Sequence, residues 1–339
     1  MNELTKQLLI RCYNNEMLAG DASQNIMGDE EAIKQLCNET FNNGTVTTDK
    51  LEKFNAMLFE VADIVAQPDI EQVMNFICSY TKVGADVTIK EINVPEESKL
   101  AFQFTAVGSQ PDFKRIENGT KLYSTPKYAQ IGIYYEPMTR TNRCVEDFRK
   151  AVNDIAKAKV RLFVQQAMEV VKQGIASGNV PASQILDGTS TTLKNFKSVA
   201  NKVSRRCGGG QVVFLADPEL IDYYAMQQQN TTEYQLPESI KAETMKLHPT
   251  KVLDVECVNL INPYTTKTGN ETYYPVNEGY LIGASAEKPL VITEFGGLER
   301  NGSVELIDGR VKTFARIGFD IVLLYGEAMG KVVESSVTL

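Results

Sequence analysis

The sequence predicts an α+β fold in which an extended two-stranded arm leads into one very long helix, and the chain ends in strands. Residues 82–135 show patches of alternating apolar and polar side chains, interrupted by Pro95 and by Asn118 with Gly119, which is typical of strands joined by turns. Residues 143–175 carry apolar side chains at three- and four-residue steps, the pattern of an amphipathic helix. Residues 289–339 consist mostly of strand-like runs.

The extended arm has too few apolar residues to form a core of its own. A lone two-stranded ribbon is marginally stable in water, so an arm of this length needs another surface to lie on. We therefore interpret it as a segment that contacts a neighbouring subunit.

The long helix has clear signals at both ends. Asn142 can cap it, Glu146 and Asp147 stand in its first turn, and Gly178 and Pro181 follow its end. At about 1.5 Å per residue it forms a rod of roughly 45 Å. We expect it to pack against the closing strands in residues 310–333, although the stripe alone also fits a core helix of an ordinary α/β domain. The stripe consists of Val145, Phe148, Val152, Ile155, Phe163, Ala167, Val171 and Ile175.

Residues 1–66 are expected to be helical. Leu51, Phe54, Leu58, Val61 and Val65 form a short seam suited to pairing with another helix, either in the same subunit or in a neighbouring copy. Thr48 or Asp49 can cap this helix and Pro68 is expected to close it. We expect residues 1–66 to assist assembly without being needed for the remainder to fold.

From residue 181 onward the pattern is mixed. A helix is expected over residues 193–203, the triplet 208–210 of three glycines is expected to be a flexible hinge, and a strand follows at 212–215. Asp217 then caps a helix that begins at Pro218. The further strands are expected at residues 252–261, 280–283, 290–295, 304–307, 310–325 and 331–333.

Composition limits the functional class. With 339 residues, 43% of them hydrophobic and 23% charged, the chain is long enough for two cores. A net charge of −8 argues against a general nucleic-acid binder, and the basic residues 202–206 are expected to close a helix instead. We expect no signal peptide, and no apolar run approaches the ~20 residues that a membrane span needs.

The sequence contains almost no motif that indicates catalysis or metal binding. The single histidine, His248, stands in no metal-ligand spacing or catalytic motif, and the six cysteines are scattered like free thiols. Gly296 and Gly297 are expected to form a turn, and the acidic groups at residues 29–31 and 96–97 to be solvated. We therefore predict no catalytic, cofactor-binding or metal-binding residues, and no enzyme activity.

The order of these elements resembles the major capsid proteins of tailed bacteriophages, the Hong Kong 97-type fold that encapsulin shells share. The resemblance covers roughly residues 70–335. Its strongest local parts are residues 121–135, KLYSTPKYAQIGIYY, which lead toward the long helix, and residues 314–331, FARIGFDIVLLYGEAMGK, which resemble the closing strand of the family.

The resemblance implies a domain organisation. Residues 1–67 would be a helical N-terminal arm or scaffold-like extension, and residues 68–180 the first part of the peripheral (P) domain. That part would hold the E-loop at about residues 84–131 and the spine helix at about 143–175. Residues 181–288 would form a mixed α/β axial (A) domain, and residues 289–339 would return to the P domain.

The resemblance also implies a function: self-assembly into hexamers and pentamers of an icosahedral shell around double-stranded DNA. The expected partners are copies of the same chain, a portal, scaffolding or cement proteins, and DNA through weak non-specific contact, without a membrane. The location would be the virion capsid, assembled in the host cytoplasm. The alternatives are an encapsulin-like compartment shell and, more remotely, a two-domain α/β hydrolase.

The tip of the arm is the expected subunit contact. It mixes both charge signs around one aromatic side chain, and arginine and aromatic residues often dominate interface energies. The residues concerned are Asp112, Phe113, Lys114, Arg115 and Glu117.

Overall fold

The computed structural model describes residues 3–14, 16–19, 28–41, 47–74, 77–94, 120–135, 144–230, 249–260, 262, 264, 268–270, 272, 274–283, 288–300, 305–307 and 310–338. The chain forms two compact units. The first comprises Met1–Asp63, Thr81–Val152 and Thr293–Asp320, and the second comprises Ile64–Tyr80, Asn153–Ile292 and Ile321–Leu339.

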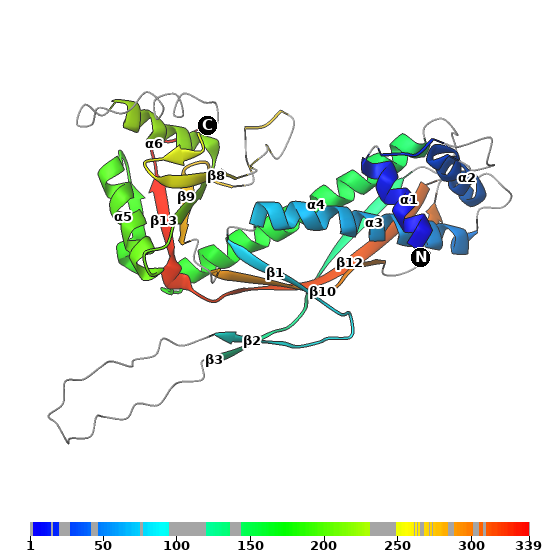
Figure 1. The fold of residues 1–339 in the computed structure, drawn as a ribbon, viewed down its shortest axis with the longest axis horizontal. Coiled ribbons are helices and arrows are strands. Elements are labelled where there is room, and N and C mark those ends of the chain that lie inside the picture. Colours follow the sequence, from blue (N-terminus) through cyan, green and yellow to red (C-terminus); the bar gives the residue numbers. More distant parts are fainter. Residues whose placement is uncertain are drawn as a thin grey trace, which may run out of the picture. The chain divides into compact units, whose positions relative to one another are not determined.

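Helices and strands follow one another along the chain in the order that Figure 1 colours from blue to red. The helices are α1 (Glu3–Asn14), α2 (Asp29–Phe41), α3 (Thr48–Met74), α4 (Cys144–Ala176), α5 (Leu193–Arg206) and α6 (Pro218–Asn230), with 3-10 turns at Ala182–Gln184 and Gly326–Ala328. The strands are β1 (Cys78–Val83), β2 (Lys90–Val94), β3 (Thr120–Ser124), β4 (Lys127–Tyr135), β5 (Ile185–Gly188), β6 (Val212–Ala216), β7 (Lys251–Val252), β8 (Val255–Asn259), β9 (Glu278–Gly283), β10 (Leu290–Arg300), β11 (Glu305–Ile307), β12 (Arg310–Leu323) and β13 (Met329–Glu334).

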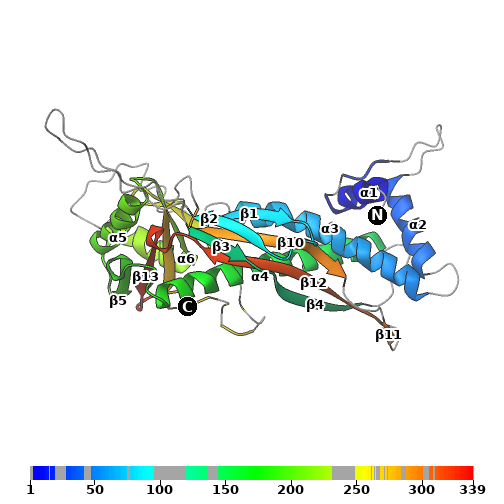
Figure 2. The same ribbon diagram turned by 90° about the horizontal axis from the view of Figure 1, so that it is seen from below.

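The described strands form three sheets, which confirms the predicted α+β class. A five-stranded sheet has the order β1-β10-β12-β11, with β4 also paired to β12, and Figure 2 shows β1, β10 and β12 side by side. A six-stranded sheet has the order β5-β13-β9-β6-β8-β7, and β2 pairs with β3 alone. The C-terminal strands thus serve both larger sheets.

Two helices and the six-stranded sheet share one apolar core. All of β6 is buried, and Phe196 of α5 packs against Phe214 of β6 and Tyr224 of α6, with ring centroids 5.0 and 4.7 Å apart. Thr192 caps α5 by accepting a hydrogen bond from the backbone of Asn195. The helices and the strand expected in this region are confirmed.

The three glycines after α5 form a cap and not the expected hinge. Gly208 and Gly209 have φ values of +69° and +83°, and the Gly209 N–H donates to the Ser204 carbonyl at 2.8 Å. This geometry satisfies a carbonyl that the helix end would otherwise leave unpaired, and glycine adopts it without a steric penalty.

The long helix is confirmed as α4, with 33 residues. Its predicted stripe is buried except for Ile175, which is half-buried. The chain leaves the helix at Gly178, which has φ +79°. Near this end a Cβ on Gly174 would lie 2.4 Å from Leu323 Cδ2, which is a contact with the closing strand β12. Asn142, the expected cap, lies outside the described residues.

The expected end of α3 at Pro68 is wrong, because the helix continues through it to Met74. A proline inside a helix costs ~3 kcal/mol, since it removes one hydrogen bond and crowds the preceding turn. The turn that follows buries Ile70 and Met74, at 0% and 2% exposed. Burial of two such side chains contributes roughly 1.5–3 kcal/mol each, enough to offset the proline. The predicted boundary at residue 67 therefore falls inside α3.

The apolar seam of α3 finds its partners within the chain. Phe54 is 1% exposed and makes edge-on ring contacts with Phe41 of α2 and Phe148 of α4, at centroid distances of 5.2 and 6.1 Å. Leu51, Leu58 and Val61 are also buried. The sequence left open whether the seam packs within its own subunit or against a neighbouring copy. At these positions it packs within its own subunit.

The predicted ribbon is present as β2 and β3, which pair antiparallel from Lys90 with Ser124 to Val94 with Thr120. It is shorter at its C-terminal end than the expected E-loop limit of about residue 131. The chain enters β4 at Lys127, and β4 pairs with β12 and not with the ribbon.

Two backbone expectations are wrong. Gly296 and Gly297 lie inside β10 and do not form a turn; their φ values of +86° and +151° distort the strand locally. The single strand expected over residues 252–261 is the hairpin of β7 and β8, which turns at Leu253 with φ +57°.

Two side-chain expectations are also wrong. Asp29 is 7% exposed instead of solvated, and it accepts hydrogen bonds from Arg11 Nε and Nη2 at 2.8 and 2.9 Å. The bond from Arg11 is the main reason that the pKa of Asp29 is lowered. Cys37 is disulfide-bonded, whereas Cys12, Cys78, Cys207 and Cys257 are free as expected.

Candidate subunit-contact surfaces

The predicted contact residues at the tip of the arm lie outside the described residues: Asp112, Phe113, Lys114, Arg115 and Glu117. His248 and the acidic pair at 96–97 lie outside them as well. The described part of the arm is the base of the ribbon and the strand that follows it.

The ribbon has one sheltered face and one exposed face. Ile92 and Leu122 pair across the sheltered face, where Ile92 is 9% exposed. On the exposed face, Tyr123 stands opposite Glu91 and is 61% exposed, and the Lys121 ammonium lies 2.7 Å from the Glu91 carboxylate. Ile89, just before β2, is 58% exposed. We name Ile89, Glu91, Lys121 and Tyr123 the ribbon surface.

The junction between the ribbon and β4 is fixed to β12 by a polar contact. Ser124, fully buried, donates from Oγ to Asp320 Oδ2 at 3.1 Å, and the exposed Lys127 lies 3.1 Å from Asp320 Oδ1. These partners are almost two hundred residues apart in sequence. No local pattern in the sequence identifies them, because only the β4–β12 register brings them together.

A second exposed surface lies on β4 and β12. The register places Tyr128, Gln130, Gly132 and Tyr134 on one face of β4, opposite Gly318, Arg316, Phe314 and Lys312 of β12. Tyr128 and Tyr134 are 60% and 67% exposed, and the Arg316 guanidinium lies over the Tyr128 ring at 4.5 Å. We name these eight residues the tyrosine face. The opposite face of β12 is buried through Ala315, Ile317 and Phe319.

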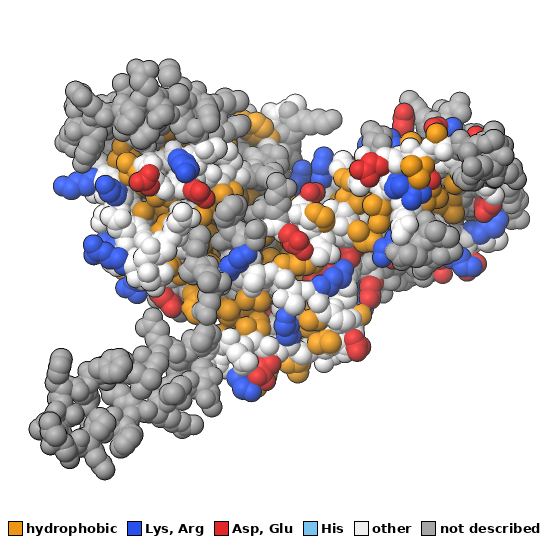
Figure 3. Space-filling model, viewed as in Figure 1, with side chains coloured by type: hydrophobic (Ala, Val, Ile, Leu, Met, Phe, Trp, Pro, Cys, Tyr) orange, Lys and Arg blue, Asp and Glu red, His pale blue; other side chains and the backbone are white. Residues whose placement is uncertain are grey.

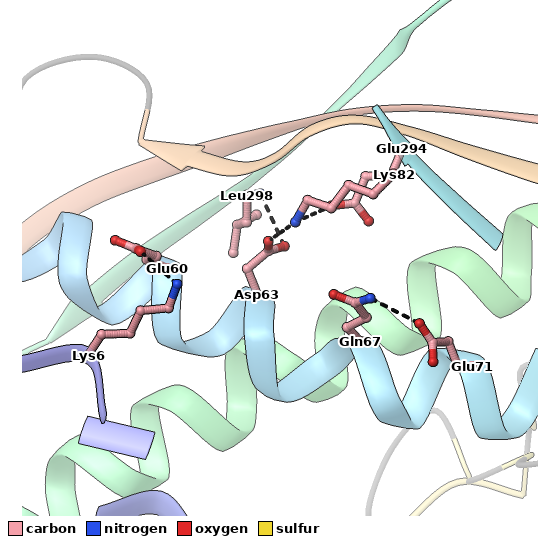
Figure 4. Close-up of polar contacts among 8 residues, drawn as sticks. All are labelled: Lys6, Glu60, Asp63, Gln67, Glu71, Lys82, Glu294 and Leu298. Atoms are coloured by element: carbon pink, nitrogen blue, oxygen red, sulfur yellow. Dashed lines mark hydrogen bonds and ion pairs between the residues drawn. The ribbon is translucent and has the colours of Figure 1, made fainter. Parts of the chain in front are cut away.

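A cluster of charges ties α3 to two strands, as Figure 4 shows. The Lys82 ammonium of β1 lies 2.5 Å from Asp63 and 3.5 Å from Glu294 of β10, and Asp63 also accepts from the Leu298 N–H at 3.2 Å. Glu294 is fully buried. Burial alone would lower the pKa of Lys82, but the hydrogen bond and charge of Asp63, with the charge of Glu294, outweigh it and raise the pKa.

A second buried carboxylate organises the turn before α5. Glu334 of β13 accepts hydrogen bonds from the backbone N–H groups of Ser190 and Thr191 at 2.8 and 2.5 Å, and from Ser336 Oγ at 2.5 Å. Burial alone would raise the pKa of Glu334. The hydrogen bonds from Ser336 and Thr191 overcome it and lower the pKa to about 2. This group therefore stays ionised and structural.

Both charge signs are interspersed over the described residues on the face in Figure 3. Within the described ranges, no three acidic, cysteine or histidine side chains gather as a metal site. Among the described helices, none has the length and apolar character to cross a bilayer.

Comparison with known proteins identifies the family. The model of a family described as "SPbeta prophage-derived putative capsid protein YonB" matches residues 1–333. The chain belongs to the YonB family of prophage capsid proteins. A member of the YonB family from Bacillus subtilis (strain 168), the SPbeta prophage-derived uncharacterized protein YonB, is 33% identical over 337 residues, which cover 98% of this chain and 96% of that protein.

Comparison with solved structures shows that this member of the YonB family has the phage capsid fold. The Satellite phage P4 procapsid, which includes the size determination protein Sid, matches with a TM-score of 0.51 and 13% identity, over 83% of this chain and 96% of that one. The bacteriophage PhiM1 mature capsid matches with a TM-score of 0.50 and 12% identity, over 78% and 87%. The predicted Hong Kong 97-type fold, with its ribbon and long helix, is confirmed.

Proposed function

We propose that this protein is a major capsid protein, whose copies assemble into the hexamers and pentamers of an icosahedral shell that encloses double-stranded DNA. The observation that carries the proposal is the match of residues 1–333 to a family of capsid proteins. This family favours a viral shell over an enzyme compartment or a hydrolase, and we propose no enzyme activity.

The ribbon supports the proposal on physical grounds. β2 and β3 form a two-stranded sheet of their own among the described strands, and such a ribbon is marginally stable alone. Its exposed face nevertheless carries Tyr123 and Ile89, two large apolar side chains at more than half exposure. A neighbouring copy that covers the ribbon surface would stabilise the ribbon and remove this apolar area from water. Each surface of a ring-forming subunit must complement a different surface on the next copy.

The finer assignments belong to the same proposal. Residues 1–67 act as the N-terminal arm, which α3 joins without a break to the P domain of residues 68–180 and 289–339, and residues 181–288 act as the A domain. The shell is completed by a portal and by scaffolding or cement proteins, and it assembles in the host cytoplasm. A net charge of −8 supports only weak, non-specific contact with the packaged DNA.

Purification followed by light scattering and negative-stain electron microscopy tests the proposal. We expect closed megadalton particles with five- and sixfold rings, and nuclease-protected double-stranded DNA in particles from a productive host. A monomer or dimer that persists at high protein concentration would contradict self-assembly. Particles that enclose protein cargo and no DNA would contradict the viral role.

A further inference from the structure

Gly132 stands in the interior of β4, where glycine is an unfavourable choice because it loses the most backbone freedom and adds no side chain to the sheet. Glycine is required in a strand when φ is positive, when the strand bulges, or when another group approaches closely. Gly132 is not among the described residues with positive φ, and the β4–β12 register continues past it without a bulge. A Cβ placed on it would meet no atom within 4 Å.

The neighbouring strand supplies a useful contrast. Gly318 of β12 is explained within the chain, because a Cβ there would lie 3.1 Å from Tyr128 Cε1. Tyr128 therefore covers Gly318, the glycine opposite it on β12. Gly132 lies on the same face of β4, with Gln130 between it and Tyr128, and no side chain of the described residues covers it. The tyrosine face thus has a bare patch of backbone between Tyr128 and Tyr134.

The side chains around this patch suit a protein partner of opposite charge. Tyrosine and arginine are the residue types that most often dominate interface energies. Among these eight residues the charged side chains are Lys312 and Arg316, both positive, while Glu305 of β11 stands opposite Lys312 in the sheet and the whole chain carries −8. A second copy carries more acidic than basic side chains, 43 against 35, which favours contact with these two cations.

We propose that the tyrosine face is a contact surface for a second copy of this chain, whose acidic segment passes over Gly132 between Tyr128 and Tyr134. This inference rests on the proposed self-assembly and names one surface that performs it. The tyrosine face is continuous with the ribbon surface in the chain, since only Thr125 and Pro126 separate β3 from β4. Glycine at position 132 lets the partner approach the strand closely.

The Gly132→Val variant tests the proposal, because the substitution improves the strand of the isolated subunit while filling the patch. Valine favours strands, and its Cβ would meet no atom of the chain within 4 Å. We expect the unassembled variant to melt at the wild-type temperature or above, and its assembly to be at least tenfold slower by light scattering. Gly188→Ala is the matched control: its Cβ would make only an ordinary contact, 3.8 Å from Thr191 Cγ2, and we expect normal assembly.

A second variant removes attraction instead of adding bulk. The combination Tyr134→Ser with Arg316→Gln is expected to slow assembly at least tenfold while leaving the subunit folded. If both variants assemble at the wild-type rate, or if Gly132→Val destabilises the unassembled subunit, the proposal is overturned. If the wild-type protein itself forms no particles, the proposed function fails first, so the two failures are distinguishable.

Discussion

Glu334 and Lys82 show how single buried charges fix the fold. Each binds groups from segments that are distant in sequence: Glu334 reaches the turn at Ser190 and Thr191, and Lys82 reaches Asp63 and Glu294. Removing one partner of a buried charge is costly, because the remaining charge stays buried without compensation.

Glu334 is expected to make the stability of the fold depend on pH in the acid range. Its folded pKa of about 2 lies below the ordinary 4.5, so its contribution is fully present above pH 4.5 and is lost as the pH falls toward 2. A shift of more than two units corresponds to roughly 3 kcal/mol. The Glu334→Gln variant should lose this contribution and show a flatter decline of melting temperature between pH 4.5 and 2. Asp187→Asn, an exposed carboxylate of β5, is the control. Parallel pH profiles for wild type and Glu334→Gln would refute this role.

Loss of the Lys82 side chain is expected to lower the free energy of unfolding more than loss of an exposed lysine in a surface ion pair. Lys82→Ala removes the ammonium that lies 2.5 Å from Asp63 and 3.5 Å from the fully buried Glu294. Because Lys82 is one-third exposed, we expect a loss of about 2–3 kcal/mol, below the 3–5 kcal/mol of a fully buried pair. Lys53→Ala, which breaks the exposed Lys53–Asp49 pair, should cost about 0.5 kcal/mol or less. Equal losses in chemical denaturation would show that the cluster is not special.

At the scale of elements, local signals predicted α4 as a whole, whereas they predicted the start of α3 and not its end. The stripe of α4 repeats over many turns and ends in glycine, so local signals agree with each other. Pro68 is a strong local signal in α3, but tertiary burial of Ile70 and Met74 overrides it. Asp63, Ser124 and Asp320 escaped sequence reasoning because their partners are brought close only by long-range pairing.

The centre of α4 is expected to be a major source of stability. Phe163 is fully buried and packs edge-on against Tyr80 with a centroid distance of 6.4 Å. Phe163→Ala should cost ~3–5 kcal/mol through lost burial and the cavity that remains. Lys157→Ala, on the exposed side of the same helix, should stay within about 0.5 kcal/mol of wild type. An unchanged melting temperature for Phe163→Ala would contradict this assignment.

The N-terminal helices are expected to belong to the core, in contrast to the hypothesis from the sequence. A chain that begins at residue 68 loses Phe54 from its contact with Phe148, and Asp63 from its contact with Lys82. We expect this truncation to lose cooperative unfolding. A chain that begins at residue 47 keeps both contacts and should retain a cooperative transition. A wild-type melting curve for the chain that begins at residue 68 would restore the original hypothesis, in which residues 1–66 assist assembly and the fold does not need them.

At the scale of the whole molecule, recognition between copies follows from surfaces that the fold leaves exposed. The ribbon surface and the tyrosine face both carry large aromatic side chains that are more than half exposed, on strands that follow each other in the chain. Exposed apolar side chains that gather on neighbouring elements indicate contact with another molecule. The family could be recognised from the order of elements, whereas these surfaces required the strand register, which a sequence does not reveal when the partners are β4 and β12.

The tip of the arm remains the predicted place where neighbouring subunits recognise each other. Lys114 and Arg115 stand beside Phe113 in a long polar segment, and ordering such a segment costs roughly 1–2 kcal/mol per residue unless contacts offset it. Reversing both charges, Lys114→Glu with Arg115→Glu, should leave the subunit folded and slow assembly, most strongly at low salt where charges are least screened. The control is Lys194→Glu with Lys197→Glu, which changes net charge equally at two exposed positions of α5. Equal slowing in both variants would assign the effect to net charge. Wild-type assembly of the tip variant at low salt would place recognition elsewhere on the subunit.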